Sequence, residues 1–332
     1  MYAANGFASS RALVFALATV LAVLPLTNSR AEKPADGDAA SSNLRVVSYN
    51  VQFLPGPAAV ANERKNAKYR ARTIGQKMAA FDIVCLNEVF DDAPRNLLLD
   101  QLKKAWGDDY QAITGPKPMD NRVNGGLAIA SRLPFVETHS VIYTKASSPK
   151  KYGFRADGFA AKGVLHARVR RSKEADDDDY LDVFVTHMEA RVDEIRLEQY
   201  PELAAFVAQH SDPRHPVLIL GDFNTRGDPS YRKDPDAPYH LLFTVLDKNL
   251  PTARLIDSWA SRYPEKLGGT NEQESSDIGH RIDYVFLANP EEAASELKLI
   301  DVRVNGYLDP KVVALSDHSA VEAELHWTPA KR

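Results

Sequence analysis

Several apolar segments of this sequence run directly into a carboxylate, an amide or an imidazole, and this feature limits the folds open to the chain. In "VLILGDFNT", four apolar residues lead into Gly221, Asp222 and Asn224. A core strand gains nothing from such groups, because burying a polar side chain without a partner costs free energy. Similar endings occur in "VVSYN", "IVCLNE" and "VFVTH". The pattern predicts strands whose polar ends meet at one edge of a sheet.

Apolar segments alternate with longer helical patterns along the chain. The expected strands cover 44–51, 82–89, 110–114, 126–132, 141–144, 163–170, 181–188, 216–223, 280–287 and 319–327. The expected helices cover 61–81, 93–106 and 192–210, the last with a kink at Pro201. These strands are too many for a single doubly wound parallel sheet, and hairpin-like pairs lie between the helices. The sequence therefore predicts an α/β sandwich of two packed sheets with helices outside.

The first residues have the pattern of a secretory signal peptide. Arg11 precedes an apolar run from Ala12 to Leu26, and small residues allow cleavage near Ala31. A membrane anchor is the alternative, but the run is short for a span of about 20 apolar residues. Residues 32–43 are small and polar and indicate a flexible lead-in, followed by one domain at 44–328. We expect a secreted or periplasmic protein.

Composition narrows the function classes. The formal net charge is −4, and loss of Arg11 and Arg30 with the leader would make it −6. This acidic balance argues against general affinity for nucleic acid, although it leaves a local basic groove open. The one cysteine, Cys85, excludes an internal disulfide and is expected to be buried in a strand. The acidic run at 176–179 is expected to be a solvated hairpin loop.

The polar residues at the strand ends form a chemically coherent set. They are Asn50, Glu88, His187, Asp222, Asn224, Asp283, Asp317 and His318, with Asp283 expected inside a strand. Carboxylate and amide oxygens without a thiolate suit Mg²⁺ or Mn²⁺ better than a closed zinc site. Such a cation beside histidines suits phosphoryl-ester hydrolysis. Taken singly, each residue could be a satisfied buried polar group, "NGG" at 124–126 a hairpin turn, and "SDH" a cap.

The ordered segments resemble the endonuclease/exonuclease/phosphatase superfamily, which includes deoxyribonuclease I-like nucleases, inositol polyphosphate phosphatases and neutral sphingomyelinases. The resemblance covers about residues 44–326 and rests on "SYNVQFL", "DIVCLNEVF", "NGGLAIASRLPF", "VFVTHMEA", "LILGDFNT", "HRIDYVFL" and "LSDHSAVEAEL". It implies a four-layered α/β/β/α sandwich of two mixed sheets, with a single catalytic domain. It also implies Mg²⁺ as the cofactor, with Mn²⁺ or Co²⁺ as substitutes.

The resemblance also implies a role for each residue of the set. Metal binding would fall to Asn50, Glu88 and Asp317. Catalysis would fall to His187, Asp222, Asn224, Asp283 and His318. Substrate binding would fall to Lys162, Asn224 and His187. His318 would be the general base and Asp283 would hold its tautomer, although the division of base work between Asp222 and His318 stays open. Water would attack phosphorus in line, without a covalent enzyme intermediate.

Within the superfamily, several segments are similar to secreted sphingomyelinases C. These are "LNEVFD", "GGLAIASRLPF", "FAAKGVLHARV" and "THMEA". The resemblance implies a sphingomyelin or related choline-lipid substrate, transient contact with a membrane surface and no protein partner. Ala161 stands where those enzymes commonly have Asn, and 288–316 holds one Tyr and no Trp or Phe, which argues against strong membrane insertion. A nuclease or other phosphodiesterase using the same site is the alternative, and a non-catalytic binding protein is the third hypothesis.

Overall fold

The structure, a computed structural model, describes residues 43–56, 58, 65–120, 122–153, 156–172, 179–250, 253–272 and 275–328. The expected signal peptide at 1–31 lies outside the described residues. So do the lead-in at 32–43, except Asn43, and the acidic run at 176–179, except Asp179. The domain limits at 44 and 328 therefore stay predictions. Within the described part, no helix has the length and apolar character that crossing a membrane requires.

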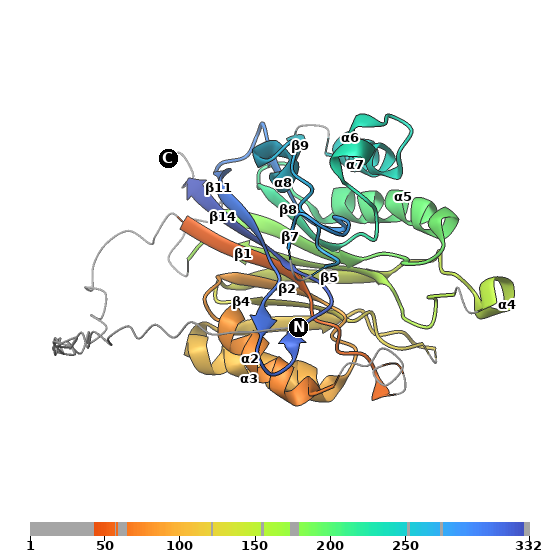
Figure 1. Cartoon of the computed structure of the whole chain (residues 1–332). Helices are drawn as coiled ribbons and strands as arrows, with labels where there is room; N and C mark the ends of the chain where they lie inside the picture. The colour runs from red at the N-terminus through yellow and green to blue at the C-terminus, as the bar shows by residue number, and fades with distance from the viewer. Residues whose placement is uncertain are drawn as a thin grey trace, which may run out of the picture. The chain divides into compact units, whose positions relative to one another are not determined.

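Two six-stranded mixed sheets form the centre of the fold (Figure 1). The first sheet has the order β11 (Glu296–Asn305), β14 (Ala320–Thr328), β1 (Asn43–Asn50), β2 (Ile83–Asn87), β4 (Leu127–Ser131) and β3 (Gln111–Gly115). The second has the order β5 (Phe135–Ile142), β6 (Gly163–Arg170), β7 (Tyr180–His187), β8 (Val217–Asp222), β10 (Asp283–Pro290) and β9 (Ala253–Asp257). A separate short pair joins β12 (Leu308–Asp309) and β13 (Val313–Ala314).

Helices cover the outer faces of both sheets. The first sheet packs against α2 (Ala67–Met78) and α3 (Asp92–Trp106). The second packs against α5 (Asp193–His210) and α7 (Pro238–Lys248). The inner faces of the two sheets share a core that includes Val46, Ile129, Val183, Leu220 and Leu325. This arrangement confirms the expected four-layered α/β/β/α sandwich. The remaining short helices are η1 (Gly107–Asp109), α4 (Pro149–Tyr152), α6 (Pro229–Lys233) and α8 (Ser258–Arg262).

Strand direction brings the polar strand ends together. β1 and β2 run parallel, as do β7 and β8, so the carboxyl ends of each pair lie at the same edge. β10 and β14 run antiparallel to β8 and β1, so their first residues lie at that edge too. Asp283 is the first residue of β10 and pairs with Asp222. The expectation that Asp283 lies inside a strand was wrong.

Other boundaries differ from the sequence-based expectation where the apolar pattern is weak. The expected helix at 61–81 is α2, which begins at Ala67 after Asn66 in a left-handed conformation. The strand expected at 141–144 is β5, an edge strand with mostly exposed positions that begins at Phe135. The helix expected to kink at Pro201 runs without interruption through that proline as α5. The sequence did not predict α7, β9 or β11.

Gly221 allows the close approach of β7 and β8. Its φ is +133°, a conformation that residues with side chains rarely adopt. A Cβ atom at this position would lie 2.0 Å from the carbonyl oxygen of Thr186. The glycine of the "GDFN" segment therefore permits the pairing that sets Asp222 opposite His187.

Asp182 forms a buried polar network on β7. Its carboxylate accepts hydrogen bonds from His166 Nε2 at 2.8 Å and from Arg168 Nε at 2.9 Å. Burial by itself raises the pKa of Asp182, but the hydrogen bonds from His166 and Arg168 outweigh burial and hold that pKa well below its ordinary value. Because the folded state lowers the pKa, this group stabilises the fold above its unfolded pKa, near 3.9.

We expect Asp182→Asn to lower the free energy of unfolding at pH 7 by about 1–3 kcal/mol, because Arg168 and His166 lose a charged partner. The difference from the unaltered protein should shrink as the pH falls from 4 towards the lower folded pKa, where Asp182 is protonated. Urea unfolding at pH 7, 5 and 3 measures this, with the exposed Asp108→Asn as control. A difference that is constant with pH would contradict the assignment.

Candidate active site

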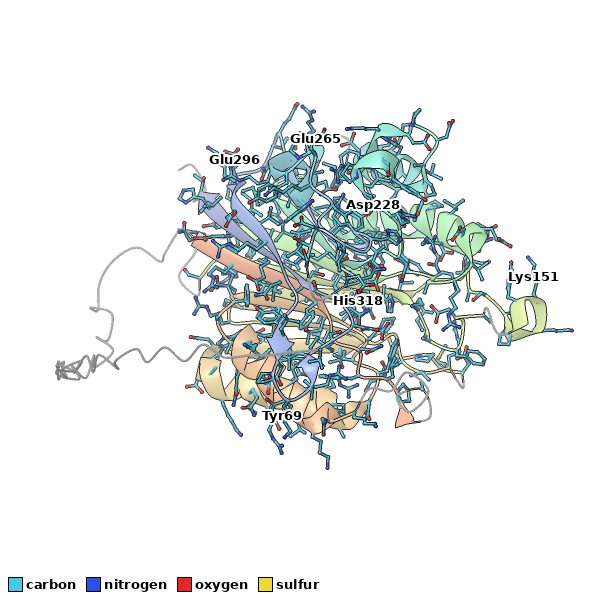
Figure 2. All side chains as sticks on the ribbon, in the orientation of Figure 1. Tyr69, Lys151, Asp228, Glu265, Glu296 and His318 are labelled. Atoms are coloured by element: carbon cyan, nitrogen blue, oxygen red, sulfur yellow. The ribbon has the colours of Figure 1, made fainter. Side chains whose placement is uncertain are left out.

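Three of the expected site residues, Glu88, His187 and His318, converge on a fourth, Asp222. His187 Nε2 lies 3.5 Å from Asp222 Oδ2 and 3.9 Å from Glu88 Oε1. His318 Nε2 lies 3.9 Å from Asp222 Oδ2. Glu88 and His318 follow or precede strands of the first sheet, whereas His187 and Asp222 end strands of the second. The site therefore lies where the edges of both sheets meet, and Figure 2 shows His318 within the body of the fold, with Lys151 at its periphery.

Asn50 joins the two sheets at this edge. Its Nδ2 donates to Asp222 Oδ2 at 3.1 Å, and its Oδ1 accepts from the backbone N–H of Gln52 at 3.2 Å. Ser316 Oγ also donates to the backbone carbonyl of Asn50 at 2.6 Å. The last residue of β1 is thereby tied to β8 and to the segment that carries His318. Glu88 follows β2 with a φ of +58°, an uncommon backbone conformation that sets its side chain at the site.

His318 is oriented by Asp283. The distance from His318 Nδ1 to Asp283 Oδ2 is 2.8 Å, and the backbone N–H of Asp283 donates to Thr270 Oγ1 at 3.1 Å. A carboxylate can only accept, so Nδ1 carries a proton and Nε2 faces Asp222. Burial by itself lowers the pKa of His318, but Asp283, Asp222 and nearby Asp317 outweigh burial and hold it well above its ordinary value.

His187 is held by Lys162 from the start of the neighbouring strand. The Lys162 ammonium lies 2.8 Å from His187 Nε2 and 2.8 Å from Asp157 Oδ2, and it donates to the carbonyl of Met188 at 3.2 Å. An ammonium group can only donate, so His187 Nε2 accepts. Burial lowers the pKa of His187 well below its ordinary value, and the charges of Lys162 and His318 lower it further. The imidazole is therefore neutral at pH 7.

The crowded carboxylates fit a divalent cation. Burial raises the pKa of Glu88, and the charge of Asp317 raises it further. Burial and the neighbouring Asp283 raise the pKa of Asp222 to about 7. Glu88, His187 and Asp222 each present a donor atom within 4.8 Å of the others. Buried oxygen donors whose ionisation is opposed by their neighbours are the environment that a hard cation stabilises.

Asn224 and Asp317 occupy the flanks of the site. Asn224 has a φ of +50°, so the chain turns after β8 and does not continue as an extended strand through Asn224. The Asn224 backbone N–H donates to Asp222 Oδ1 at 2.9 Å, and its Nδ2 donates to the carbonyl of Met188 at 3.0 Å. Asp317 accepts a hydrogen bond from Gln52 Nε2.

A cleft of about 460 Å³ opens beside these groups. Its charged lining comprises Glu88, Asp157, Lys162, Arg191 and Asp317. Its apolar lining includes Leu54, Pro55, Phe90, Val123 and Phe159. The cleft offers both a polar floor and an apolar wall to a ligand that reaches Glu88.

Sequence reasoning missed three contributors to this region. Gln52 stands two residues after Asn50 in the quoted "SYNVQFL" segment, so its position at a strand end was a usable signal. Asp157 gave no signal, because it lies far from any strand end. The "NGG" segment does not form a tight hairpin turn. Asn124 Nδ2 donates to the backbone carbonyl of Phe90 at 3.1 Å. A Cβ atom on Gly126 would lie 2.4 Å from the aromatic ring of Phe90.

Comparison with known proteins gives consistent results. The sequence model of the endonuclease/exonuclease/phosphatase family matches residues 47–318. Sphingomyelinase C of Bacillus cereus is 23% identical over 190 residues, covering 52% of this chain and 54% of that protein. The chain thus spans about half the length of the first relatives that it matches. Sphingomyelinase C of Listeria ivanovii is 24% identical over 281 residues, covering 77% of this chain and 76% of that protein.

The fold is also found among solved structures. A double mutant of beta toxin from Staphylococcus aureus with bound magnesium ions superimposes with a TM-score of 0.57. It is 19% identical, and the match covers 87% of this chain and 100% of that one. At this identity the likeness concerns the fold, and it agrees with the four layers described above.

We expect Lys162→Met to raise the pKa of His187, because the ammonium charge that disfavours the imidazolium is removed. Lys162→Arg is the matched control, since it keeps the charge. Titration of the His187 imidazole by NMR in the metal-free protein measures the change. Equal pKa values in the Met and Arg variants would show that burial alone holds His187 neutral.

Proposed function

Because the chain belongs to the endonuclease/exonuclease/phosphatase family, we propose that it is a metal-dependent phosphodiesterase, and specifically a sphingomyelinase C that releases phosphocholine. The observation that carries this proposal is the convergence of Glu88, His187, Asp222 and His318 beside a cleft. The relatives named sphingomyelinase C support the choice of substrate, at identities of 23% and 24%.

Glu88 holds the cation in this proposal, with Asn50 and Asp317 beside it. Mg²⁺ is the ion that carboxylate and amide oxygens favour, and Mn²⁺ or Co²⁺ would be accepted as substitutes. The bound ion supplies positive charge that neutralises phosphate oxygens and offsets the carboxylates around His318. His187, Lys162 and Asn224 would contact the phosphate oxygens.

His318 acts as the general base. Asp283 holds the proton on Nδ1, so Nε2 is free to take a proton from the attacking water. Asp222 lies 3.9 Å from that nitrogen and orients the water. The water oxygen bonds to phosphorus as the bond to the ceramide oxygen breaks in line on the opposite side. The leaving ceramide oxygen takes a proton from solvent, and His318 returns to solvent the proton that it took from the water. Phosphocholine and ceramide are the products, and no covalent enzyme intermediate forms.

The lining of the cleft supports a choline headgroup over a polynucleotide. Lys162 and Arg191 face three carboxylates there, whereas a groove for single-stranded nucleic acid requires an excess of positive charge. Phe90 and Phe159 line the cleft, and aromatic rings attract quaternary ammonium groups. Phe159 is 61% exposed, which suits transient contact with a membrane surface. We propose a secreted or periplasmic enzyme that needs no protein partner.

A nuclease or another phosphodiesterase with the same catalytic residues is the second candidate. It rests on chemistry alone, because the groups around Asp222 act on the phosphate and do not select the alcohol that leaves. A non-catalytic protein is disfavoured, since Glu88, His187, Asp222 and His318 are all present and held together.

We expect the purified protein to release phosphocholine from sphingomyelin in Mg²⁺, to lose this activity in EDTA and to leave supercoiled DNA intact. Glu88→Gln, checked for folding by circular dichroism, should reduce the rate by on the order of 10²–10³-fold. DNA nicking without phosphocholine release would mean that the substrate assignment is wrong. Full activity of Glu88→Gln would overturn the assignment of the site.

We expect Asp283→Asn to reduce kcat by on the order of 10²–10⁴-fold, because the tautomer of the general base is no longer held. The negative charge of Asp283 raises the pKa of His318, so its removal lowers that pKa. A base must be deprotonated to act, so the acid limb of the kcat/KM profile should move to lower pH. A reduced kcat with an unmoved acid limb would argue that His318 is not the base.

A further inference from the structure

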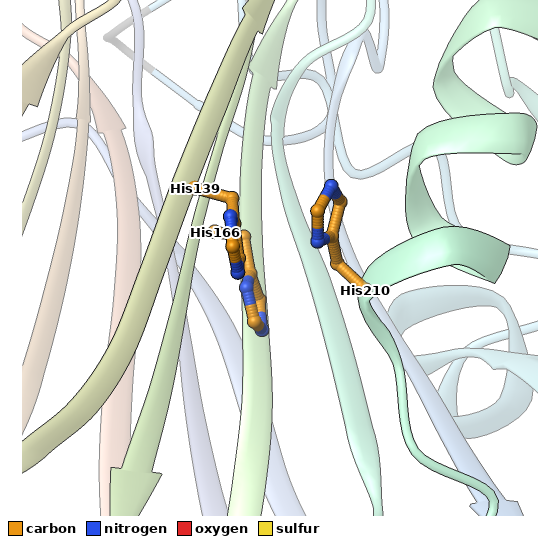
Figure 3. A group of neighbouring side chains, drawn as sticks. All are labelled: His139, His166 and His210. Atoms are coloured by element: carbon orange, nitrogen blue, oxygen red, sulfur yellow. The ribbon is translucent and has the colours of Figure 1, made fainter.

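Three histidines meet on the outer face of the second sheet, away from the site described above. His139 lies on β5, His166 on the adjacent β6, and His210 is the last residue of α5 (Figure 3). One ring nitrogen of each lies within 4.8 Å of a ring nitrogen of the other two. His166 pairs across the sheet with Phe184, three residues before His187, so the cluster is separate from the catalytic edge.

His166 has a nitrogen that no described residue satisfies. Its side chain is fully buried and stacks on Phe184 with a centroid separation of 4.5 Å. Nε2 donates to Asp182 Oδ1 at 2.8 Å, because a carboxylate can only accept. The proton is therefore on Nε2, and Nδ1 has a lone pair without a hydrogen-bond partner in the described part of the chain. A buried polar atom of this kind requires a partner.

The hydrogen bond to Asp182 is the kind that supports a metal ligand. Histidines that bind metals commonly donate their second ring N–H to a carboxylate, which fixes the tautomer and raises the basicity of the ligating nitrogen. Arg168 Nε donates to Asp182 Oδ1 at 2.9 Å and fixes this carboxylate, which in turn fixes the orientation of the His166 ring. Because the His166 ring packs against Phe184, it cannot rotate to expose Nδ1 to solvent.

The charges around the cluster favour a cation. Glu137 Oε1 lies 2.6 Å from His139 Nε2, and Arg168 Nη1 donates to Glu137 Oε2 at 2.6 Å. Arg168 therefore pairs with two carboxylates, Glu137 and Asp182. Its single positive charge neutralises one of their two negative charges, so a net charge of −1 remains beside the three imidazoles. Glu137 therefore contributes charge beside the cluster through its contact with His139.

We propose that His139, His166 and His210 form a second metal site, which takes a divalent transition-metal ion such as Zn²⁺ and links β5 and β6 to the end of α5. Three imidazoles select Zn²⁺ over Mg²⁺, which prefers oxygen ligands. The three rings stack as they stand, with centroid separations of 4.0 Å for His139 and His210, 5.7 Å for His139 and His166, and 5.9 Å for His166 and His210. An ion must lie in the plane of each ring that binds it, so His139 and His210 must turn towards Nδ1 of His166. Both rings are partly exposed, so they can turn about the Cβ–Cγ bond when the ion binds.

The site would join an edge strand to the rest of the fold. Among the strands that the structure describes, β5 pairs with β6 alone, and most of its residues are exposed. An ion bound by β5, β6 and α5 would hold this edge in place. Binding to the folded state alone would also raise the melting temperature.

Calorimetric titration with Zn²⁺ in saturating Mg²⁺ tests the proposal, because Mg²⁺ occupies the oxygen-rich catalytic site. We expect one Zn²⁺ per chain and a higher melting temperature with Zn²⁺. His139→Ala and His210→Ala should each weaken binding at least about tenfold. His326→Ala, which changes a partly exposed histidine on β14, should bind as the unaltered protein does. Circular dichroism verifies the folding of each variant.

Electron paramagnetic resonance with Cu²⁺ identifies the ligands independently of activity. The spectrum should show hyperfine coupling to several imidazole nitrogens in the unaltered protein and in Glu88→Gln, and fewer in His210→Ala. Absence of Zn²⁺ binding, or equal binding by His139→Ala, His210→Ala and His326→Ala, would overturn the proposal. Loss of binding in Glu88→Gln alone would assign the ion to the catalytic site instead.

Discussion

The parallel pairing of β7 and β8 is the interaction on which the candidate active site depends. It requires Gly221, because the carbonyl oxygen of Thr186 occupies the space that a Cβ atom would need. The pairing sets His187 opposite Asp222, and the antiparallel β10 then adds Asp283 to the same row. Asn50, at the end of β1 in the first sheet, donates a hydrogen bond to Asp222 and so connects the two sheets at this edge. One backbone contact thereby determines where the groups from both sheets meet.

At this edge of the sheets, the carboxylates of the site carry more negative charge than the neighbouring cationic groups neutralise. Asp222 and Glu88 are shifted towards their protonated forms, while His318 is shifted towards its charged form. A row of hydrophobic residues would stabilise these strand ends better, since buried ionisable groups are costly. A catalytic role for these groups would explain why this unfavourable burial is retained, because strongly shifted pKa values are concentrated at functional sites.

The fold, and the meeting of the polar strand ends at one edge, could be predicted from the sequence because long apolar segments make strands visible and their polar ends stand out. Asp283 was misplaced because isoleucine and apolar neighbours flank it, although the strand begins at the aspartate itself. The turn at Asn224 depends on a left-handed backbone that the residue type permits but does not require. β5 was misplaced because an exposed edge strand lacks an apolar run. His166 gave no signal because its neighbours Phe184 and His210 come from other elements, β7 and α5.

The strand order of the first sheet determines when, during synthesis, the protein can become active. β1 lies between β2 and β14, and Asn43 pairs with His326. A growing chain therefore cannot complete this sheet until β14 has been synthesised, and His318 arrives only just before that strand. Contacts between such distant segments also slow folding. Catalytic activity would thus be withheld from every partly made chain until its synthesis was almost complete.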